Sequence, residues 1–411
     1  MSDLVTTKAT AVSWQVGLEN IESWSGEFVE TESEFAGEGI EFTPDDILFG
    51  KLRPYLAKVY LAERSGEAVG DFFVIRPQKV FASYLHKYIL SPSAIDTLSS
   101  STIGAKMPRV SWEEMGSLPV ALPALVEQGQ IARFLDHETT RIDALIAEQE
   151  RLIELLKEKR QAVISHAVTK GLDPTAPMKD SGVEWLGEVP AHWELAKVKH
   201  VIESFEQGWS PQCENVPVES DKEWGILKVG CVNGGIFSSE ENKRLPAELD
   251  PIPELFLMAG DVLISRANTR ELVGSAALAD SDYPNLMLSD KLFRLRATEK
   301  VLPKYLVLYL GTIAVRHQIE LEATGASSSM LNIGQAVIKE LYIPVPSVSE
   351  QQEIVAYLNY ELENYFELES QALTTIDLLQ ERRSALISAA VTGKIDVRNW
   401  QAPSPAEALA R

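Results

Sequence analysis

Two long stretches of the chain carry apolar residues at helical spacing. They cover about residues 130–168 and 349–391, contain no proline or glycine inside those limits, and place charged residues at the outer positions. A seven-residue spacing of this kind predicts helices that pack along one another. The repeated positions are Leu135, Ile142, Leu156 and Val163, with a second set at Ile131, Leu145 and Leu152, in the first stretch, and Leu358, Tyr365, Ala372, Leu379 and Leu386 in the second.

The two stretches belong to an internal repeat. A shift of 223 residues lays 118–173 over 341–396 without a gap, and 20 of the 56 aligned positions are identical, among them Gln128/Gln351 and Arg160/Arg383. A duplication that keeps one register through both stretches favours an antiparallel coiled coil within the chain over a pair of ordinary bundle helices. The sequence therefore predicts two long helices that pack together.

Two regions of mixed pattern accompany these helices. We expect strands in runs such as DDILFG (45–50), DFFVIRP (71–77) and GDVLISR (260–266), helices near 82–100 and 303–321, and a short strand with prolines before each long helix. The predicted fold is α/β (α+β), with two globular heads, two long helices and an internal pseudo-two-fold duplication. The predicted parts are a first head (1–123), a central helix (124–172), a second head (173–346), a C-terminal helix (347–396) and a tail (397–411).

Composition narrows the class of protein. The 411 residues are 45% hydrophobic and 24% charged, which is typical of globular proteins and excludes disordered, collagen-like and membrane classes. No apolar run reaches the length of a signal peptide or a membrane span, so we expect a cytoplasmic protein that has no membrane partner. Cys213 and Cys231 are too few for a disulfide framework, and no spacing of metal ligands is present, so we expect no bound metal.

The charge is unevenly distributed. A net charge of −22 argues against a nucleic-acid partner, because DNA affinity depends on basic residues that neutralise phosphates. Residues 1–50 hold one lysine and eleven acidic residues, whereas residues 51–111 hold nine basic and four acidic residues. A local basic surface on an acidic chain therefore remains compatible with DNA binding.

Several segments resemble one protein family. The run KDSGVEWLGEVPAHWEL (179–195), the proline and glutamine at the entry to each long helix (Pro123 and Gln128; Pro346 and Gln351) and the two helix ends (160–173 and 382–396) are similar to specificity subunits of type I restriction-modification systems. The resemblance covers nearly the whole chain.

The resemblance implies a non-catalytic subunit that reads a bipartite, asymmetric target in double-stranded DNA. Each head would read one half-site, and the helical pair would set their spacing and dock two methyltransferase (modification) subunits and the restriction/translocase subunits. No cofactor is then expected on this chain, since S-adenosylmethionine, ATP and Mg²⁺ would belong to the partners. In agreement, the sequence contains no GxxxxGK[ST] phosphate loop and no Asn-Pro-Pro-aromatic motif.

The first head departs from the family pattern. The second head runs about forty residues from Trp185 to Val229-Gly230, whereas the first head reaches the equivalent Val16-Gly17 almost at once. We therefore expect the first head to lack its opening segment, either because the true start lies upstream or because the protein is shortened and its first head impaired. A coiled-coil scaffold that binds protein alone, or a methylation-only or inactive remnant, is the alternative function.

Candidate DNA contacts lie in two places in each head. A small-residue loop precedes the last strand of each head, at 99–111 and 322–334, and Gly and Ser allow the backbone to approach a phosphate closely. Basic residues follow a central strand, where Arg suits guanine edges and Asn suits adenine edges. A plain turn and solvated loop charges are the competing interpretations. The candidates are Lys51, Arg53, Lys106, Arg109, Arg266, Asn268, Arg270, Lys291, Arg294, Ser327 and Ser328.

Other conspicuous residues are expected to be structural. The apolar neighbours of Trp185 and Trp193 favour core packing over base stacking, and His166 falls on the predicted helical seam. Lys291, Arg294 and Arg296 alternate along one predicted strand face, where either DNA backbone contact or surface salt pairing would account for them. We predict no catalytic residue in this chain.

Overall fold

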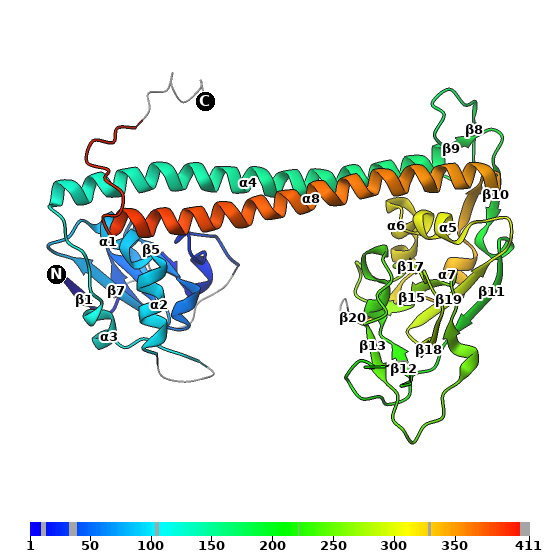
Figure 1. Cartoon of the computed structure of the whole chain (residues 1–411), viewed down its shortest axis with the longest axis horizontal. Coiled ribbons are helices and arrows are strands. Elements are labelled where there is room, and N and C mark those ends of the chain that lie inside the picture. Colours follow the sequence, from blue (N-terminus) through cyan, green and yellow to red (C-terminus); the bar gives the residue numbers. More distant parts are fainter. Residues whose placement is uncertain (10–13, 33–38, 103–106, 221, 328–329, 403–411) are drawn as a thin grey trace. The chain divides into compact units, whose positions relative to one another are not determined.

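A computed structural model describes residues 1–9, 14–32, 39–102, 107–220, 222–327 and 330–402. The chain divides into two compact units, of which unit 1 comprises Met1–Leu152 with Gln371–Arg411 and unit 2 comprises Ile153–Ser370. Helices α4 (Leu125–Lys170) and α8 (Val348–Val391) contribute residues to both units, as Figure 1 shows. Both predicted long helices are thus confirmed, and α4 begins several residues before its predicted apolar repeat.

The two helices pack antiparallel within each unit. In unit 1, Ile131 and Leu135 near the start of α4 share a core cluster with Ile387 and Ala390 near the end of α8. In unit 2, residues near the end of α4 share a core cluster with residues near the start of α8. The predicted antiparallel coiled coil is confirmed in this sense.

In the second apolar set predicted for α4, Ile131 is buried as expected, whereas Leu145 and Leu152 are wrong by one residue. Leu145 and Leu152 are 45% and 40% exposed, whereas Ile153 is buried. The buried and half-buried positions follow the heptad Thr139, Ile146, Ile153 and Arg160, beside the confirmed set that contains Leu135 and Ile142. Because this buried seam contains a threonine and an arginine, the exposed leucines beside it gave the stronger apolar pattern in the sequence.

Polar contacts fix the register of the seam. In unit 1, Arg383 of α8 binds the carboxylate of Asp143 on α4 (Nε–Oδ1 2.8 Å) and donates to the carbonyl of Trp24 (3.0 Å). Its repeat equivalent in unit 2, Arg160, lies over the ring of Phe366 at 5.2 Å and 3.9 Å from the carboxylate of Glu369. The same arginine of the repeat therefore joins the two helices in each unit.

Each head contains the same antiparallel sheet of four strands. Its order is β1-β7-β4-β5 in unit 1 and β11-β19-β15-β17 in unit 2. In sequence order the bounds are β1 Ser2–Val5, β4 Ile47–Gly50, β5 Val59–Leu61, β7 Phe72–Pro77, β11 Ile202–Gln207, β15 Val262–Ser265, β17 Ala276–Leu278 and β19 Leu292–Ala297. The strands predicted at 45–50, 71–77 and 260–266 are β4, β7 and β15.

A second sheet in each head contains one parallel pair. Its order is β2-β6-β3 in unit 1 and β13-β12-β18-β14 in unit 2, with β2 parallel to β6 and β12 parallel to β18. The bounds are β2 Gln15–Val16, β3 Ile40–Phe42, β6 Gly66–Ala68, β12 Gly225–Leu227, β13 Asn242–Arg244, β14 Phe256–Leu257 and β18 Tyr283–Met287. The duplication predicted from the sequence thus extends through the heads.

The helix predicted over 82–100 is two helices, α1 (Ala82–Ile89) and α2 (Pro92–Ser100). Ser91 caps α2 by accepting a hydrogen bond from the amide of Ala94, and Pro92 occupies the first helical position. The helix predicted over 303–321 is likewise divided into α5 (Pro303–Leu310) and α6 (Ile313–Leu321). In the first head, local capping therefore overrides the continuous apolar pattern.

Two polar residues of the repeat attach each head to its long helices. The hydroxyl of Tyr84 on α1 donates to the carbonyls of Ala121 and Val391, and Tyr305 on α5 donates to the equivalent carbonyls of Pro344 and Val168. Because all four carbonyl positions correspond under the 223-residue shift, this attachment was duplicated with the rest of the unit.

The glutamine at each helix entry has the same role in both units. Gln351 is fully buried, accepts a hydrogen bond from the amide of Leu302 and donates to the carbonyls of Lys300 and Pro346. Gln128 accepts from the amide of Phe81 and donates to the carbonyl of Pro123. These bonds join the start of each long helix to the loop before the head's helical pair.

The segments before the two long helices differ. After α7 (Gln335–Lys339), β22 (Tyr342–Val345) pairs with β10 (Glu194–Lys197) and is largely buried. After α3 (Trp112–Ser117), residues 119–122 form no strand and are largely exposed. The short strand predicted there is wrong, because the described part of unit 1 supplies no strand that corresponds to β10.

Unit 2 contains two further small sheets. Strands β8 (Met178–Asp180) and β9 (Glu188–Pro190) form a hairpin, which precedes the buried Trp193. Trp193 belongs to the main core cluster of the unit and Trp185 packs against that cluster, which confirms the predicted core role. No described helix is long and apolar enough to cross a membrane.

Candidate nucleic-acid interface

The structure brings the two predicted contact regions of the second head together. Strand β15 continues past Ser265 into β16 (Ala267–Asn268), which pairs with β21 (Met330–Asn332), and β21 pairs with β20 (Thr324–Ser327). The amide of Ile333 donates to the carbonyl of Arg266 (3.0 Å). The basic loop and the small-residue loop are therefore parts of one three-stranded sheet, in which residues 324–327 and 330–332 are strands.

The first head has an equivalent arrangement. We call the place where the basic loop meets the small-residue loop the junction of each head. The amide of Val110 donates to the carbonyl of Lys51 (3.0 Å), and Val110 and Lys51 hold the places that Ile333 and Arg266 hold in the second head. The amide of Arg53 donates to the carbonyl of Pro108 (2.8 Å), and Leu52 bridges Arg109. Although the two heads differ in sequence, the same backbone bonds place their basic residues beside the later loop.

The polar side chains at the second junction are partly engaged. Arg266 is half-buried and donates from its guanidinium to the carbonyl of Asp290 (3.2 Å). Arg270 is exposed and pairs with Glu320 of α6 at 3.2 Å. Surface pairs of this kind contribute about 0–1 kcal/mol, so a phosphate could replace Glu320 at little cost. The amide of Asn268 lies 3.4 Å from that of Asn233.

One basic side chain of the first junction has no acidic partner among the described residues. Arg53 is exposed, adopts the left-handed conformation (φ 52°), and has no carboxylate oxygen of a described residue within 4 Å of its guanidinium. Lys51 and Arg109 share the carboxylate of Asp71, at 3.7 and 2.8 Å. A left-handed backbone at a residue other than glycine costs of order 1–3 kcal/mol and is frequent at functional sites. Arg53 is therefore the most available cation of this junction.

Arg294 is not a surface residue, contrary to the prediction. Its side chain is 2% exposed, pairs with Glu206 and Asp261, and donates to the carbonyls of Phe256 and Glu254. It joins the two sheets of the second head, because β11 and β15 lie in one and β14 in the other. Arg294 cannot contact DNA without giving up its pairs with Glu206 and Asp261 and its bonds to the two carbonyls, which would leave Asp261 with Arg296 as its basic partner.

The predicted alternation of Lys291, Arg294 and Arg296 along one strand face is also wrong. Lys291 lies in the turn before β19 and is exposed, and its odd separation from Arg294 excludes a shared face. Arg296 pairs with Asp261 at 2.7 Å, and this hydrogen bond raises its pKa. The surface salt-pairing interpretation is therefore correct for Arg296.

Three other candidates are only partly described. Lys106 and Ser328 lie outside the described residues. Ser327 is the last residue of β20 and is paired with Met330 through the backbone, while its side chain is not described. The sequence reasoning missed Asn233, which lies beside Asn268 and precedes two glycines with positive φ; the turn-forming Asn-Gly-Gly run could have indicated it.

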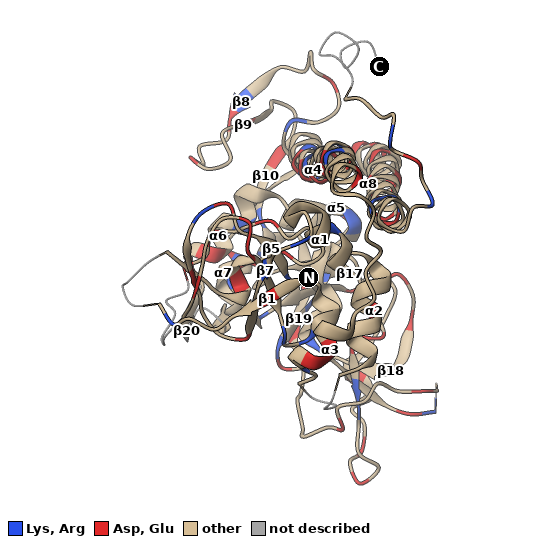
Figure 2. Ribbon diagram, turned by 90° about the vertical axis from the view of Figure 1, so that its left-hand side faces the viewer, with Lys and Arg blue, Asp and Glu red and all other residues tan. Residues whose placement is uncertain are grey.

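Other chemistry is not favoured at these junctions. Among the described residues, no group of three or more His, Cys, Asp or Glu side chains is arranged to hold a metal ion. Cys231 is fully buried, and burial raises the pKa of its thiol well above the ordinary value. Basic and acidic residues are interspersed along α4, whereas α8 carries acidic residues over most of its length and its two arginines, Arg382 and Arg383, follow them (Figure 2).

Comparison with known proteins agrees with this geometry. The family model described as "Type I restriction modification DNA specificity domain" matches residues 233–378, which include β15, β16, β20 and β21. The specificity subunit of the type I restriction enzyme EcoKI from Escherichia coli (strain K12) is 25% identical over 81% of this chain and 69% of its own length. These similarities support a specificity subunit of a type I restriction-modification system.

Other similar proteins match different parts of this chain. The EcoEI specificity subunit of Escherichia coli is 26% identical over 58% of this chain, an alignment that spans only 39% of that relative. Among solved structures, a chain from a study of complex assembly in a type I restriction-modification system has a TM-score of 0.70 at 18% identity, over 95% of this chain and 93% of its own. The HsdS subunit from Thermoanaerobacter tengcongensis has a TM-score of 0.53 at 19% identity, over 95% and 92%.

These matches bear on two predictions. The likeness to the solved chains confirms the fold of a specificity subunit, with its mixed heads and long helices. Because the matching family model describes a DNA specificity domain, the expectation that the chain is not itself an enzyme agrees with its family.

Proposed function

We propose that this specificity subunit reads a bipartite, asymmetric DNA target, with one half-site bound at each junction. The observation that carries the proposal is the repeated backbone geometry: Ile333 to Arg266 and Val110 to Lys51 make the same hydrogen bond in heads of different sequence. Two equivalent positions with unlike side chains are what two unlike half-sites require.

The roles of the side chains follow from their partners. Arg53 and Arg266 have no competing carboxylate among the described residues and are proposed to contact base edges. Lys51, Arg109 and Arg270 are proposed to exchange their surface carboxylates for DNA phosphates. For Lys106, Asn268, Lys291, Ser327 and Ser328 a DNA contact remains a prediction.

We also propose that α4 and α8 dock two modification subunits and the restriction subunits, in the cytoplasm. The support is the exposed apolar residues of these helices, among them Leu145, Leu152 and Leu378, which are 40–61% exposed. S-adenosylmethionine, ATP and Mg²⁺ are then proposed to bind the partner subunits.

The deciding experiment is to co-express the chain with its modification subunit and map methylated bases in the host genome. A split motif with two different halves is the expected result. Methylation of a motif with only one defined half would instead favour an impaired first head, for which the exposed segment 119–122 is a specific reason.

A protein-only scaffold is the competing function. In that case the purified complex would form but bind DNA no more tightly at a methylated motif than elsewhere. Binding should be measured over a range of salt concentrations, because proposed phosphate contacts imply that affinity falls as salt rises. A flat salt dependence of the complex would contradict the proposed roles of Lys51, Arg109 and Arg270.

A further inference from the structure

A cavity of about 640 Å³ lies in unit 2 at the end of α4, where α4 faces the start of α8. Its lining includes Val163, His166, Leu172, Pro174 and Tyr357. Leu172 and Tyr357 are each 40% exposed, so two large apolar side chains border a space that the described residues do not fill. None of these residues belongs to the proposed DNA interface.

The repeat supplies the corresponding place in unit 1. Under the 223-residue shift, Val163 corresponds to Leu386, Leu172 to Ile395 and Tyr357 to Phe134. In unit 1 these counterparts pack in one apolar cluster together with Trp400.

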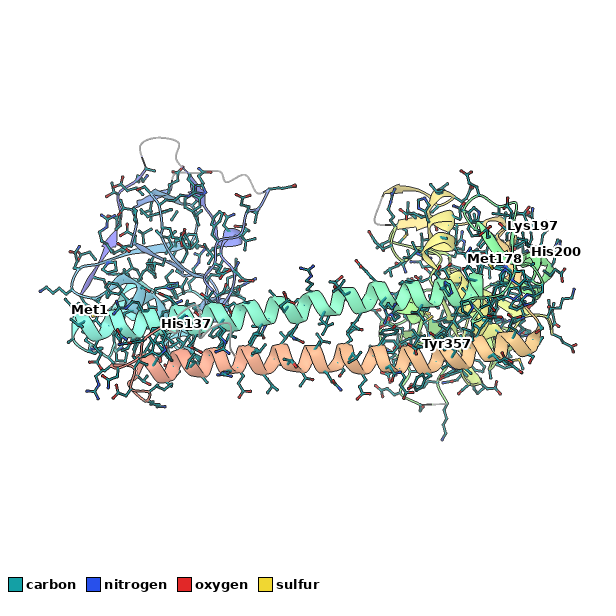
Figure 3. All side chains as sticks on the ribbon, turned by 90° about the horizontal axis from the view of Figure 1, so that it is seen from above. Met1, His137, Met178, Lys197, His200 and Tyr357 are labelled. Atoms are coloured by element: carbon teal, nitrogen blue, oxygen red, sulfur yellow. The ribbon has the colours of Figure 1, made fainter. Side chains whose placement is uncertain are left out.

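Trp400 is held there by specific contacts. Its ring lies edge-on to Phe134 at 5.4 Å between centroids and 5.4 Å from His137, and its carbonyl accepts a hydrogen bond from the side chain of Gln130. Figure 3 labels His137 on α4 and, in unit 2, Tyr357 on α8. Each unit therefore has the same groove between its two helices, and a tryptophan of the tail occupies the one in unit 1.

The exposure of the groove residues differs as expected from this occupancy. Phe134 and Ile395 are half-buried in unit 1, whereas their counterparts Tyr357 and Leu172 are exposed in unit 2. The chain after α4 cannot fill the groove in the same way, because Pro177 holds the position that corresponds to Trp400 and the chain continues into β8.

We propose that the groove of unit 2 is a docking site for a large aromatic side chain, above all tryptophan, carried by an extended segment of a partner polypeptide. The occupant is inferred from the duplicated groove, whose aromatic wall and apolar floor already hold such a segment, residues 395–400. His166 replaces Ala389 at the rim, so the unit 2 groove adds a polar group that can hydrogen-bond the segment. This proposal does not depend on DNA reading.

The test uses the chain's own tail as the probe. A fluorescently labelled peptide of residues 395–401 (IDVRNWQ) is titrated into the full chain, with the same peptide carrying Trp400→Ala as control. The unaltered chain should bind one equivalent, since its unit 1 groove is already occupied. The full chain with Trp400→Ala should bind two equivalents.

Variants then locate the site. Tyr357→Ala and Leu172→Asp should each weaken binding by tenfold or more, whereas Leu368→Ala should have no effect, because Leu368 is 46% exposed and is not part of the cavity lining. All three positions are at the surface, and thermal unfolding of each variant checks that the fold is retained.

Three results would overturn the proposal. One is the absence of saturable binding to the unaltered chain at millimolar peptide. Another is binding that neither Tyr357→Ala nor Leu172→Asp weakens. The third is equally tight binding of N-acetyltryptophanamide, which would indicate a small-molecule site in place of a polypeptide dock.

Discussion

At the scale of single residues, each head is built around a buried aspartate that binds an arginine from the neighbouring strand. Asp46 pairs with Arg76 at 2.6 Å in unit 1, and Asp261 pairs with Arg296 at 2.7 Å in unit 2. The hydrogen bonds that Arg76 donates to Asp46 raise the pKa of Arg76. Both aspartates are 1% exposed, and each carboxylate is hydrogen-bonded by its arginine, as a buried polar group requires.

The second head adds Arg294 to this cluster, and we predict that Arg294→Ala destabilises that head by about 2–4 kcal/mol, since the change leaves a cavity and removes the donor of the carbonyls of Phe256 and Glu254. Arg266→Ala, which removes one surface hydrogen bond, should change stability by no more than about 0.5 kcal/mol. Urea unfolding of both variants decides the matter. Equal stability of the two variants would contradict the structural role assigned to Arg294.

A buried histidine makes the stability of unit 1 depend on pH. His86 is fully enclosed, its Nε2 lies 2.9 Å from the carbonyl of Val59, and burial, assisted by the charge of Lys87, lowers its pKa to about 3. The folded state therefore keeps His86 neutral, while the unfolded chain takes up a proton below about pH 6.5. Stability from this group is complete above that pH and is lost as the pH falls.

We predict that the unfolding free energy of unit 1 decreases by up to about 1.4 kcal/mol per pH unit as the pH falls from 6.5 to 5, a window above most carboxylate pKa values. Denaturant titration at several pH values measures this slope. His86→Gln retains a hydrogen-bond donor without a titrating ring, so its slope should be smaller. An unchanged slope in His86→Gln would show that another group is responsible.

At the scale of elements, the coiled coil owes its register to a seam that mixes apolar and polar residues. Arg160 and Arg383 lie in the seam and contact the opposite helix in their own units. Neighbouring positions of α4 consequently differ sharply: Leu152 is 40% exposed, while Ile153 is 7% exposed.

This contrast predicts different costs for two adjacent truncations. Ile153→Ala should lower the free energy of unfolding by about 2–4 kcal/mol, because it leaves a cavity in the seam. Leu152→Ala should change it by about 0.5 kcal/mol or less. Thermal unfolding followed by circular dichroism compares the two variants. A larger loss for Leu152→Ala would mean that the seam follows the leucines after all.

At the scale of the whole molecule, duplication accounts for the matching sheets, the tyrosine and glutamine attachments and the two junctions. The two copies have since diverged. In unit 2, β10 pairs with β22, and in unit 1, Trp400 fills a groove between the helices. If each junction reads its own half-site, the two should be separable by mutation.

We predict that Arg53→Ala relaxes base preference in one half of the methylated motif only, and that Arg266→Ala does so in the other half, each at a cost of about 1–3 kcal/mol in specific affinity. Methylation mapping with the modification subunit measures both effects. Arg382→Ala, an exposed arginine of α8, is the control and should leave the motif unchanged. A change in both halves from either head variant would contradict the division of roles.

The repeat, the long helices and the central strands could be predicted from the sequence because they depend on local periodicity and on an ungapped self-alignment. The break at Ser91 and the outward leucines of α4 could not, because a cap and a polar seam residue compete with apolar pattern only once the chain is folded. Among the candidate DNA contacts, the prediction for Arg294 was wrong because the burial of a strand residue depends on which sheet packs over it.

The sequence by itself determined the duplicated architecture and carried the family resemblance, since repeated spacings and motifs need no contacts to be recognised. Only the tertiary structure decided which basic residues are available. Lys51, Arg109 and Arg270 gained carboxylate partners that are distant in the chain, and Arg294 became part of the core, while Arg53 remained exposed. The physical reason is that availability is a property of neighbours in space, which long-range packing alone sets.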